Sequence, residues 1–310
     1  MPLISIIIPV YNRETLIEQT LQSIIAQTYK NWECIIIDDH STDKTFLVTS
    51  EIAKRDSRIT IYKRPDNKPK GPCACRNYGF EKSSGHYINW FDSDDLMLPN
   101  KLEVDLKNIT SGEYDFTISQ TQFFENKSKE KKGFWNDSLF SDNPMNDFIL
   151  KNIGWSTNTP LWKKESLLKN NLVFDERLIT ADDYFYHIQA LEFGLKPKIN
   201  NQVLVKQRVH SNRLENYNVK SFFKTTVNFY LLKNYKKLSL DLMTINFLKE
   251  DTLKQLSNLY KHKNWKNAVN ISLKLMRLPK ENRDIKKVIL LFIKGTFFKL
   301  SSIGYQYLDQ

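Results

Sequence analysis

The sequence predicts an α/β fold, in which a mostly parallel sheet is flanked by helices and followed by a helical extension. Two runs, ISIIIPV at residues 4–10 and WECIIID at residues 32–38, are almost wholly apolar and rich in isoleucine. Such runs predict strands, and the stretch between them has apolar residues at helical spacing. Strands that are apolar along their whole length are typical of a parallel sheet that helices cover on both faces.

The first elements alternate regularly along the chain. In order, the pattern predicts a strand, a helix, a strand, a helix and a strand at residues 4–10, 14–27, 32–38, 41–56 and 58–64. Thr42 or Asp43 would cap the second helix, because their side-chain oxygens accept hydrogen bonds from free backbone N–H groups. Residues 1 to about 110 therefore have the pattern of an open α/β sheet of the nucleotide-binding type.

The composition is that of a soluble globular protein. The 310 residues, 41% hydrophobic and 26% charged, can form one large domain or a medium domain with an appendage. The cysteines, Cys34, Cys73 and Cys75, are too few for a disulfide framework and lack the second pair that a structural zinc site needs. They indicate a reducing compartment, so we expect a cytoplasmic protein.

The apolar runs of the sequence do not predict a membrane span. MPLISIIIPVYN, at residues 1–12, has no basic segment and is interrupted by Pro9, which indicates a strand and not a signal peptide. The run VILLFI at residues 288–293 is too short to cross a bilayer.

The net charge of +11 is concentrated in the last third of the chain. Residues 211–310 contain 19 Lys and Arg against 7 Asp and Glu, whereas residues 1–210 contain 27 against 28. We therefore expect a domain at residues 1–215 and a basic helical extension at residues 216–310. A basic region suggests an anionic partner, which would be nucleic acid, a membrane surface or an acidic polymer.

The middle of the chain is less regular. Residues 112–150 lose clear periodicity around NKSKEKKGFWNDS, and we expect a mobile loop near the site there. The sequence contains neither G-x-G-x-x-G nor G-x-x-x-x-G-K-S/T, so the sheet is explained neither by a dinucleotide fingerprint nor by a P-loop.

Polar clusters follow three of the apolar runs, at residues 9–13, 38–41 and 92–95. Ligands of open parallel sheets bind at the carboxyl ends of strands, so these clusters predict a binding site. Strand alternation would place Asp92 and Asp94 on one side, where two carboxylates need a cation between them. Oxygen ligands favour Mg²⁺ or Mn²⁺, which also bind phosphates, and this suggests a diphosphate ligand.

Four segments together resemble the family 2 glycosyltransferases, which have the GT-A fold. They are SIIIPVYNR, IIIDDHSTD, ACRNYGFEKSSGHYINWFDSDD and RLITADDYFYHIQALEFG, at residues 5–13, 35–43, 74–95 and 177–194. The resemblance extends over roughly residues 3–215. It implies an inverting transferase that moves a sugar from a nucleotide-diphosphate donor, expected to be a UDP-sugar, to a hydroxyl of a glycan or lipid-linked acceptor. Such an enzyme would serve the synthesis of cell-surface glycans.

The resemblance also implies roles for individual residues. The nucleotide-binding residues would be Pro9, Tyr11, Asn12, Asp38, Asp39, Arg76, Asp92 and Ser93. Asp39 would accept a hydrogen bond from the uracil N3–H, and Arg76 would reach the base or the phosphates as a fixed cation. Asp94 of the Asp-x-Asp pattern would bind Mn²⁺ or Mg²⁺, and His210 would complete the metal shell.

The catalytic base of the family is a carboxylate in a Glu-Asp pair that opens a helix. This chain has Asp182-Asp183 there, so Asp183 aligns with the base and Asp182 with its partner. Acids also favour a helix N-terminus without any catalytic role, by about 0.3–1 kcal/mol. Trp155 and Asn158 lie where the acceptor is expected, although the ring of Trp155 suits core packing equally well.

The extension has the pattern of a helix in a membrane interface. KKVILLFIKGTFFKLSSIGYQYL, at residues 286–308, combines a broad apolar face with lysines. It would place a cytoplasmic enzyme at the inner face of an anionic membrane. A helical subdomain or a dimer interface with a solvated basic face explains the pattern equally well.

Three other functions were weighed against a glycosyltransferase. A nucleotidyltransferase acting on sugar phosphates would show a Gly-rich basic loop after the first strand, and YNRET at residues 11–15 is no such loop. A basic nucleic-acid-binding protein would show a recognition motif, so we expect no nucleic-acid partner. A non-catalytic sugar-binding protein would not need the acids that the sequence retains.

Overall fold

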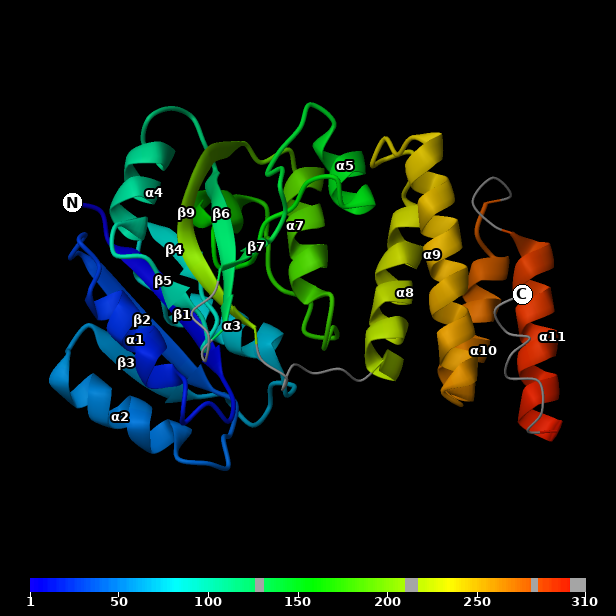
Figure 1. Ribbon diagram of the computed structural model, residues 1–310, viewed down its shortest axis with the longest axis horizontal. Helices are drawn as coiled ribbons and strands as arrows, with labels where there is room; N and C mark the ends of the chain where they lie inside the picture. The colour runs from blue at the N-terminus through cyan, green and yellow to red at the C-terminus, as the bar shows by residue number, and fades with distance from the viewer. Residues whose placement is uncertain (126–130, 210–216, 280–283, 302–310) are drawn as a thin grey trace. The chain divides into compact units, whose positions relative to one another are not determined.

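The computed structural model describes residues 1–125, 131–209, 217–279 and 284–301 (Figure 1). The chain divides into two compact units. The first comprises Met1–Pro144, Lys151–Arg177 and Asp182–Ser211, and the second comprises Met145–Leu150, Leu178–Ala181 and Asn212–Gln310. The second unit therefore includes two short segments that precede the extension predicted at residues 216–310.

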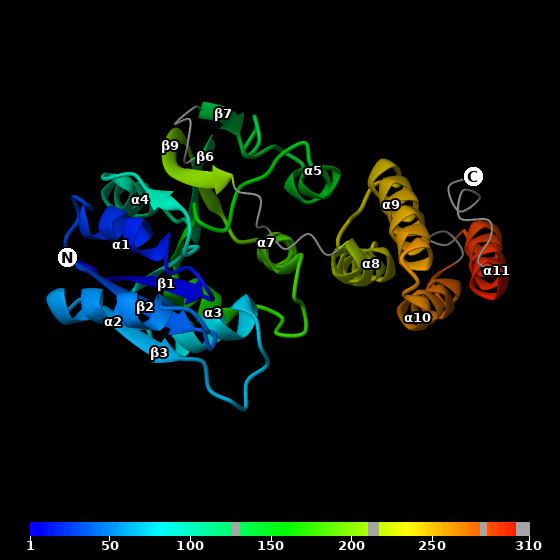
Figure 2. The ribbon, with the colours of Figure 1, turned by 60° about the horizontal axis from the view of Figure 1, so that its bottom comes forward.

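Four parallel strands form the first half of the sheet in the first unit (Figure 2). They are β3 (Ile59–Lys63), β2 (Trp32–Asp38), β1 (Ile4–Val10) and β4 (Tyr87–Trp90), in that spatial order. Val10 of β1 lies opposite Asp38 of β2, and Ile7 lies opposite Trp90 of β4. The predicted bounds of β1 and β2 are correct, because both apolar runs are buried on both faces of the sheet.

The rest of the sheet is of mixed direction. Beyond β4 follow β8 (Leu161–Lys163), β6 (Phe116–Glu125), β9 (Pro197–Val209) and β5 (Leu96–Met97), and β7 (Lys131–Phe134) pairs with β6. β8 is antiparallel to β4 and β6, β5 is antiparallel to β9, and β7 is antiparallel to β6. β6 and β9 are parallel and lie side by side. The sheet is thus wholly parallel in its first half and of mixed direction in its second.

Much of the loop that we expected at residues 112–150 is regular structure. It contains β6, β7 and α5 (Pro144–Leu150), and β7 lies within the lysine-rich stretch. The pattern concealed β6 because polar side chains of this strand are buried. Thr117 and Ser119 are both inaccessible to solvent, and the hydroxyl of Thr117 donates to Asp105 Oδ1 at 3.0 Å. A strand whose buried positions carry hydroxyl groups lacks the apolar signal of β1.

Helices cover both faces of the parallel strands. On one face Ile6 and Ile8 join a core cluster with Leu21 of α1 (Ile17–Ile25) and Ile52 of α2 (Thr45–Arg55). On the other face Ile7 meets Gly79 of α3 (Pro72–Lys82), where an added Cβ would lie 2.3 Å from Ile7 Cγ2. Glycine therefore allows the close approach of α3 to the sheet. The other helices of this unit are α4 (Lys101–Ile109), α6 (Lys164–Lys169) and α7 (Asp182–Glu192).

The N-cap residue of α2 is Lys44, which makes no side-chain cap hydrogen bond, so neither of the two expected residues stands at the cap, although Asp43 bonds to the first residue of the helix. Asp43 Oδ1 accepts the backbone N–H of Thr45 at 2.9 Å. Thr42 instead bonds to the loop after β1, because its backbone N–H donates to Asn12 Oδ1 at 2.8 Å.

The second unit is helical in the part of it that the structure describes. Besides α5 it contains α8 (Tyr217–Lys233), α9 (Leu242–Lys261), α10 (Trp265–Met276) and α11 (Ile285–Ser301) (Figure 1). Asp241 caps α9 by accepting the Thr244 N–H at 2.7 Å, and an ion pair of 2.8 Å between Lys224 and Asp251 joins α8 to α9. Among the described helices, none has the length and apolarity that crossing a membrane requires.

Candidate active site

Three polar loops meet at the carboxyl ends of β1, β2 and β4. Because β1 lies between β2 and β4, the loops that follow these strands are neighbours at one edge of the sheet. Asp39 N donates to the carbonyl oxygen of Val10 at 2.9 Å, and Phe91 N donates to that of Ile7 at 3.0 Å. The three clusters predicted from the sequence therefore lie together, within the first unit.

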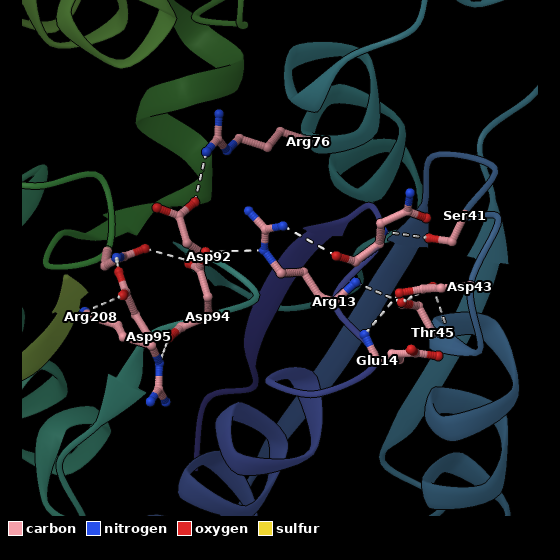
Figure 3. Close-up of polar contacts among 12 residues, drawn as sticks. Arg13, Glu14, Ser41, Asp43, Thr45, Arg76, Asp92, Asp94, Asp95 and Arg208 are labelled. Atoms are coloured by element: carbon pink, nitrogen blue, oxygen red, sulfur yellow. Dashed lines mark hydrogen bonds and ion pairs between the residues drawn. The ribbon is translucent and has the colours of Figure 1, made fainter. Parts of the chain in front are cut away.

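The loops after β1 and β2 are hydrogen-bonded to each other. Asn12 has a left-handed backbone, with φ of 50°, and its N–H donates to Ser41 Oγ at 3.0 Å. The side chain of Asn12 bonds to Thr42. Arg13 N donates to Thr45 Oγ1 at 2.7 Å (Figure 3). Asn12, which we expected to bind the nucleotide, thus joins the two loops with its side chain.

The two acids at the end of β2, Asp38 and Asp39, are buried and have different hydrogen-bond partners. Asp39 Oδ1 accepts a hydrogen bond from Arg64 Nε, and Asp39 Oδ2 accepts the Gly71 N–H at 3.0 Å. The side chains of this ion pair are only 9% and 7% exposed. Asp38 Oδ2 accepts the Ser41 N–H at 3.0 Å, whereas Asp38 Oδ1 is buried without a hydrogen-bond partner in the described part of the chain. Asp39 is therefore neutralised inside the protein.

The segment Asp92–Asp95 is a turn and not a continuation of β4. The strand alternation that we expected to place Asp92 and Asp94 on one side therefore does not reach them. Asp92 Oδ1 accepts from Arg76 Nη2 at 2.9 Å, and Asp94 Oδ2 accepts from Arg13 Nε at 3.1 Å (Figure 3). Two arginines from different elements thus supply positive charge among these acids.

A buried amide and a buried arginine hold this turn in place. Asn158 is inaccessible to solvent, accepts the Asp92 N–H on Oδ1 at 2.8 Å and donates from Nδ2 to Asp95 Oδ2 at 2.6 Å. The backbone N–H of Arg208 donates to Asp95 Oδ1 at 2.8 Å, and Arg208 Nε donates to the carbonyl oxygen of Asp94 at 2.8 Å. Both carboxylate oxygens of Asp95 therefore support the turn.

Arg76 of α3 connects this turn to the beginning of α7. It is buried, and its Nη1 donates to Asp182 Oδ2 at 2.8 Å while its Nη2 donates to Asp92. Dehydration raises the pKa of Asp92 although Arg76 lowers it, and the nearby carboxylate of Asp94 adds to the rise. The Nε of Arg76 has no hydrogen-bond partner in the described residues, so one donor of this guanidinium remains for a ligand.

Asp183 lies half-buried in the first turn of α7. Dehydration, followed by the adjacent carboxylate of Asp182, raises its pKa to about 6, although the 2.7 Å hydrogen bond from Tyr184 N and the charge of Arg76 lower it. A carboxylate with this pKa is ionised at neutral pH and is still basic enough to accept a proton. Asp182 differs because it is ion-paired with Arg76.

The two residues expected to contact the acceptor are both buried. The ring of Trp155 stacks on that of His187, with 5.3 Å between the ring centres, and burial lowers the pKa of His187 to about 3. The imidazole is therefore neutral, and the pair packs as part of the core. Because Asn158 is also buried, neither expected residue presents a surface to an acceptor, and we do not propose that role further.

The other predicted residues fall in different places. Tyr11 is exposed, and Lys70 Nζ lies 4.1 Å from the centre of its ring. Pro9 is partly buried near the end of β1, and Ser93 is buried in the turn after β4. His210, expected as a metal ligand, lies outside the described residues.

Several residues that shape the site were missed by the sequence reasoning. Arg13 and Asp95 stand in clusters that we identified, but nothing in the sequence gives their partners. Arg64 is the last residue of the third predicted strand and follows β3, and the rule that carboxyl ends of parallel strands share an edge could have found it. Arg208 has no such signal, because it lies 113 residues from Asp95, the partner that accepts its backbone N–H.

The carboxylates of the site offer a limited set of ligands to a divalent cation. Among the residues that the structure describes, no group of three or more His, Cys, Asp or Glu side chains is arranged to hold a metal ion. Mg²⁺ and Mn²⁺ commonly need only one or two protein carboxylates, because waters and substrate phosphates complete the shell. The partly exposed carboxylate of Asp94, which now contacts Arg13, has the oxygen donors for such a shared ion.

Solved structures establish the fold class. The crystal structure of S. aureus TarS 1-349 in complex with UDP-GlcNAc matches with a TM-score of 0.68 and 16% identity, over 100% of this chain and 90% of that one. At this identity the likeness shows the fold alone. The GT-A fold that the resemblance implied, with a helical C-terminal region, is confirmed.

The family follows from the sequence match. Residues 5–167, slightly more than half of the chain, match glycosyl transferase family 2. The chain belongs to this family. The match includes the three loops at the sheet edge, whereas Asp182 and Asp183 lie beyond it.

Two curated relatives show the extent of the similarity. An uncharacterized glycosyltransferase of Haemophilus influenzae is 47% identical over 106 residues, which are 34% of this chain and 42% of that protein. This chain therefore covers less than half of that relative. WfaP of Escherichia coli, described as a UDP-Glc:alpha-D-GlcNAc-diphosphoundecaprenol beta-1,3-glucosyltransferase, is 32% identical over 214 residues, or 68% of this chain and 79% of WfaP.

Proposed function

We propose that this protein transfers a sugar from a UDP-sugar to a hydroxyl group of a lipid-linked glycan, with inversion at the anomeric carbon. The observation that carries the proposal is the contact of one guanidinium, that of Arg76, with both Asp92 and Asp182. This contact brings the acids expected to hold the donor next to the acids expected to act on the acceptor. Family membership and the named activity of WfaP support the same reaction class.

The nucleotide would bind at the edge formed by the loops after β1 and β2. Tyr11 offers an exposed aromatic face, and Asp38 and Asp39 line the end of β2. Asp38 Oδ1 and Arg76 Nε are buried polar atoms without a partner in the described residues, as is expected of atoms that await a ligand. The TarS complex with UDP-GlcNAc supports a uridine nucleotide as the donor.

Asp94 would hold a Mn²⁺ or Mg²⁺ ion together with the donor diphosphate. The ion, when bound, would offset the negative charge that develops on the leaving UDP. In the ligand-free protein Arg13 contacts this carboxylate at 3.1 Å. Arg13 is therefore the side chain that has to share Asp94 or release it.

Asp183 would be the general base. It accepts the proton of the acceptor hydroxyl while the acceptor oxygen forms a bond to the anomeric carbon and the bond from that carbon to UDP breaks. Because the oxygen attacks opposite the leaving group, a single displacement inverts the configuration. The pKa of about 6 matches this role near neutral pH.

The acceptor is inferred from relatives. WfaP and WfgD of Escherichia coli both carry names that specify an α-D-GlcNAc-diphosphoundecaprenol acceptor. We infer an acceptor of the same class, a sugar on a lipid diphosphate, and a cytoplasmic protein that works at the inner face of the membrane.

A donor panel tests the proposal. Purified protein is incubated with UDP-Glc, UDP-GlcNAc or GDP-mannose, with Mn²⁺ or Mg²⁺, and with a short-chain analogue of GlcNAc-diphosphoundecaprenol. We expect transfer from one UDP-sugar. The anomeric configuration of the product, determined from its NMR coupling constant, should be opposite to that of the donor. Retention of configuration would contradict the single displacement. Transfer from the GDP-sugar alone would contradict the choice of nucleotide.

A further inference from the structure

Helix α11 of the second unit has apolar side chains on two sides. Its inner side packs against the other helices, because Val288 is only 3% exposed and a Cβ on Gly295 would lie 2.4 Å from the ring of Tyr260 in α9. On its outer side Ile289, Leu290 and Ile293 are 41%, 46% and 57% exposed. Ile293 stands one helical turn after the adjacent pair Ile289 and Leu290, so the three side chains form one stripe.

The same outer side is cationic. Lys286, Lys287 and Lys294 lie beside the aliphatic stripe, and α11 contains neither Asp nor Glu between its bounds, Ile285 and Ser301. In the described part of this helix an ion pair joins Lys287 to Asp284 at 3.4 Å, and it is largely exposed, so it offsets little of the charge. Exposed aliphatic side chains among lysines are the pattern of a helix that lies at a lipid interface.

We propose that this surface docks on an anionic lipid bilayer. The docking face of α11 consists of Lys286, Lys287, Ile289, Leu290, Ile293 and Lys294. Its aliphatic side chains would enter the boundary between headgroups and acyl chains, and its lysines would contact lipid phosphates. The helix would lie in the surface, in agreement with the finding that no described helix is suited to span a membrane.

Charge favours a bilayer over a second copy of the chain. In a symmetric dimer through this face the lysines of one copy would meet those of the other. α11 itself has no acid to pair with them, and Asp284, just before the helix, already pairs with Lys287. An anionic bilayer supplies the missing negative charge over the whole face. The surplus of 19 basic over 7 acidic residues in residues 211–310 adds attraction of the same sign.

Docking does not depend on the donor, metal or base assignments, since it concerns a different unit of the protein. It would hold the enzyme where a lipid-linked acceptor is found, so it complements the proposed function. Its test measures binding without any transfer reaction, and the two proposals can therefore fail separately.

Sedimentation with vesicles tests the docking face. Full-length protein is mixed with vesicles of phosphatidylcholine, alone or with an equal amount of phosphatidylglycerol. We expect binding to the anionic vesicles, weak binding to the neutral ones, and loss of binding as salt is raised. The double variant Lys286→Glu and Lys287→Glu should lower the partition coefficient more than tenfold, since each lysine near an anionic surface contributes about fivefold.

A second variant and matched controls separate this face from general effects. The triple variant Ile289→Gln, Leu290→Gln and Ile293→Gln should also lose vesicle binding at unchanged helix content by circular dichroism. Leu168→Gln, at a leucine 60% exposed on α6, and Lys107→Glu, at an exposed lysine of α4, should bind as the wild type does.

Three results would overturn the proposal. The first is wild-type protein that stays in solution with anionic vesicles, and the second is equal loss of binding in the control variants. The third is a dimer, measured by light scattering without lipid, that the triple glutamine variant dissociates. That result would assign the face to a second copy.

Discussion

The carboxylates of Asp39, which is buried, and Asp183, which is half-buried, have opposite electrostatic environments. Asp39 has the guanidinium of Arg64 on one oxygen and a backbone N–H on the other, so its charge is compensated inside the protein. Asp183 receives a hydrogen bond from Tyr184 N and lies beside the second carboxylate of Asp182, so its ionised form is disfavoured. The first arrangement suits an acid that must keep its charge and its place. The second suits an acid that must accept a proton.

Removal of the charge at Asp183 should have the largest effect. Asp183→Asn keeps the shape of the side chain but cannot take a proton, and loss of a general base typically lowers the rate ~10²- to 10⁴-fold. The measurement is kcat for sugar transfer, with UDP affinity by calorimetry expected to change little. Asp66→Asn, at a fully exposed acid, is the matched control. Transfer at the wild-type rate by Asp183→Asn would place the base elsewhere.

Removal of the guanidinium that pairs with Asp39 should lower the stability of the protein. Arg64→Met leaves the carboxylate of Asp39 buried without its cation, and breaking a buried ion pair from one side typically costs about 3–5 kcal/mol. Urea unfolding should show this loss. The double variant Arg64→Met and Asp39→Asn should recover part of it, because the uncompensated charge is gone. If Arg64→Met lowers the free energy of unfolding only as much as the loss of an exposed ion pair does, the carboxylate of Asp39 is solvated.

The turn that carries Asp92 and Asp94 should depend on a buried amide. Asn158→Ala removes the acceptor of the Asp92 N–H and the amide that donates to Asp95 Oδ2, and a buried group left unsatisfied typically costs about 1–3 kcal/mol. We expect lower stability and a weaker affinity for UDP. Asn100→Ala, at an exposed residue whose side chain caps no helix, should change neither. Equal UDP affinity in both variants would show that the turn does not need Asn158.

The pH profile should show the raised pKa of Asp183. The base must be deprotonated, so kcat/KM should rise with pH and level off above a midpoint of about 6 in the free enzyme. Arg76→Gln removes a positive charge that lowers this pKa, so its midpoint should lie at higher pH. If kcat/KM of the variant is lower at every pH but its midpoint is unchanged, Arg76 contributes to substrate binding and does not influence the pKa of Asp183.

The smallest effect expected is a gain in stability. The folded protein raises the pKa of Asp183 above the ordinary value of 3.8, so its contribution to stability is present below that pH and is lost as pH rises through about 6. Asp183→Asn should therefore be more stable than the wild type at pH 7, by about 1 kcal/mol after allowance for partial exposure, and equally stable at pH 3. If Asp183→Asn were less stable than the wild type at pH 7, the charge of Asp183 would not be uncompensated in the folded protein.

The strands that could be predicted from the sequence are those with solid apolar runs. β1 and β2 were found with correct bounds because both of their faces are covered. β6 was hidden by buried hydroxyl side chains, and β8, with three residues, is too short for any periodicity. The antiparallel pairings of β8 follow from contacts between distant segments, and no local pattern contains them.

The clusters of the candidate site and Arg76 were expected from the sequence, but the partners of the cations were not. Polar clusters after three apolar runs share an edge by the general rule for parallel sheets, and the structure brings them together. The cations come from far along the chain, since Arg13 is 81 residues from Asp94 and Arg76 is 106 residues from Asp182. The family resemblance pointed to Arg76 as a site residue, but no local pattern gives the carboxylates that Arg13 and Arg76 contact.

The guanidinium that Asp92 and Asp182 share has a consequence for the order in which substrates bind. A donor that draws Asp92 or Arg76 toward its own oxygens changes the neighbour of the acid pair in α7 before any acceptor arrives. We therefore expect the donor to bind first and the acceptor second, because donor binding changes the surroundings of the base. Initial-rate kinetics with UDP as a product inhibitor should then show an ordered mechanism, in which UDP competes with the donor and not with the acceptor. If the acceptor binds to the donor-free protein as tightly as to the protein with donor bound, Arg76 does not transmit donor binding to the acids of α7.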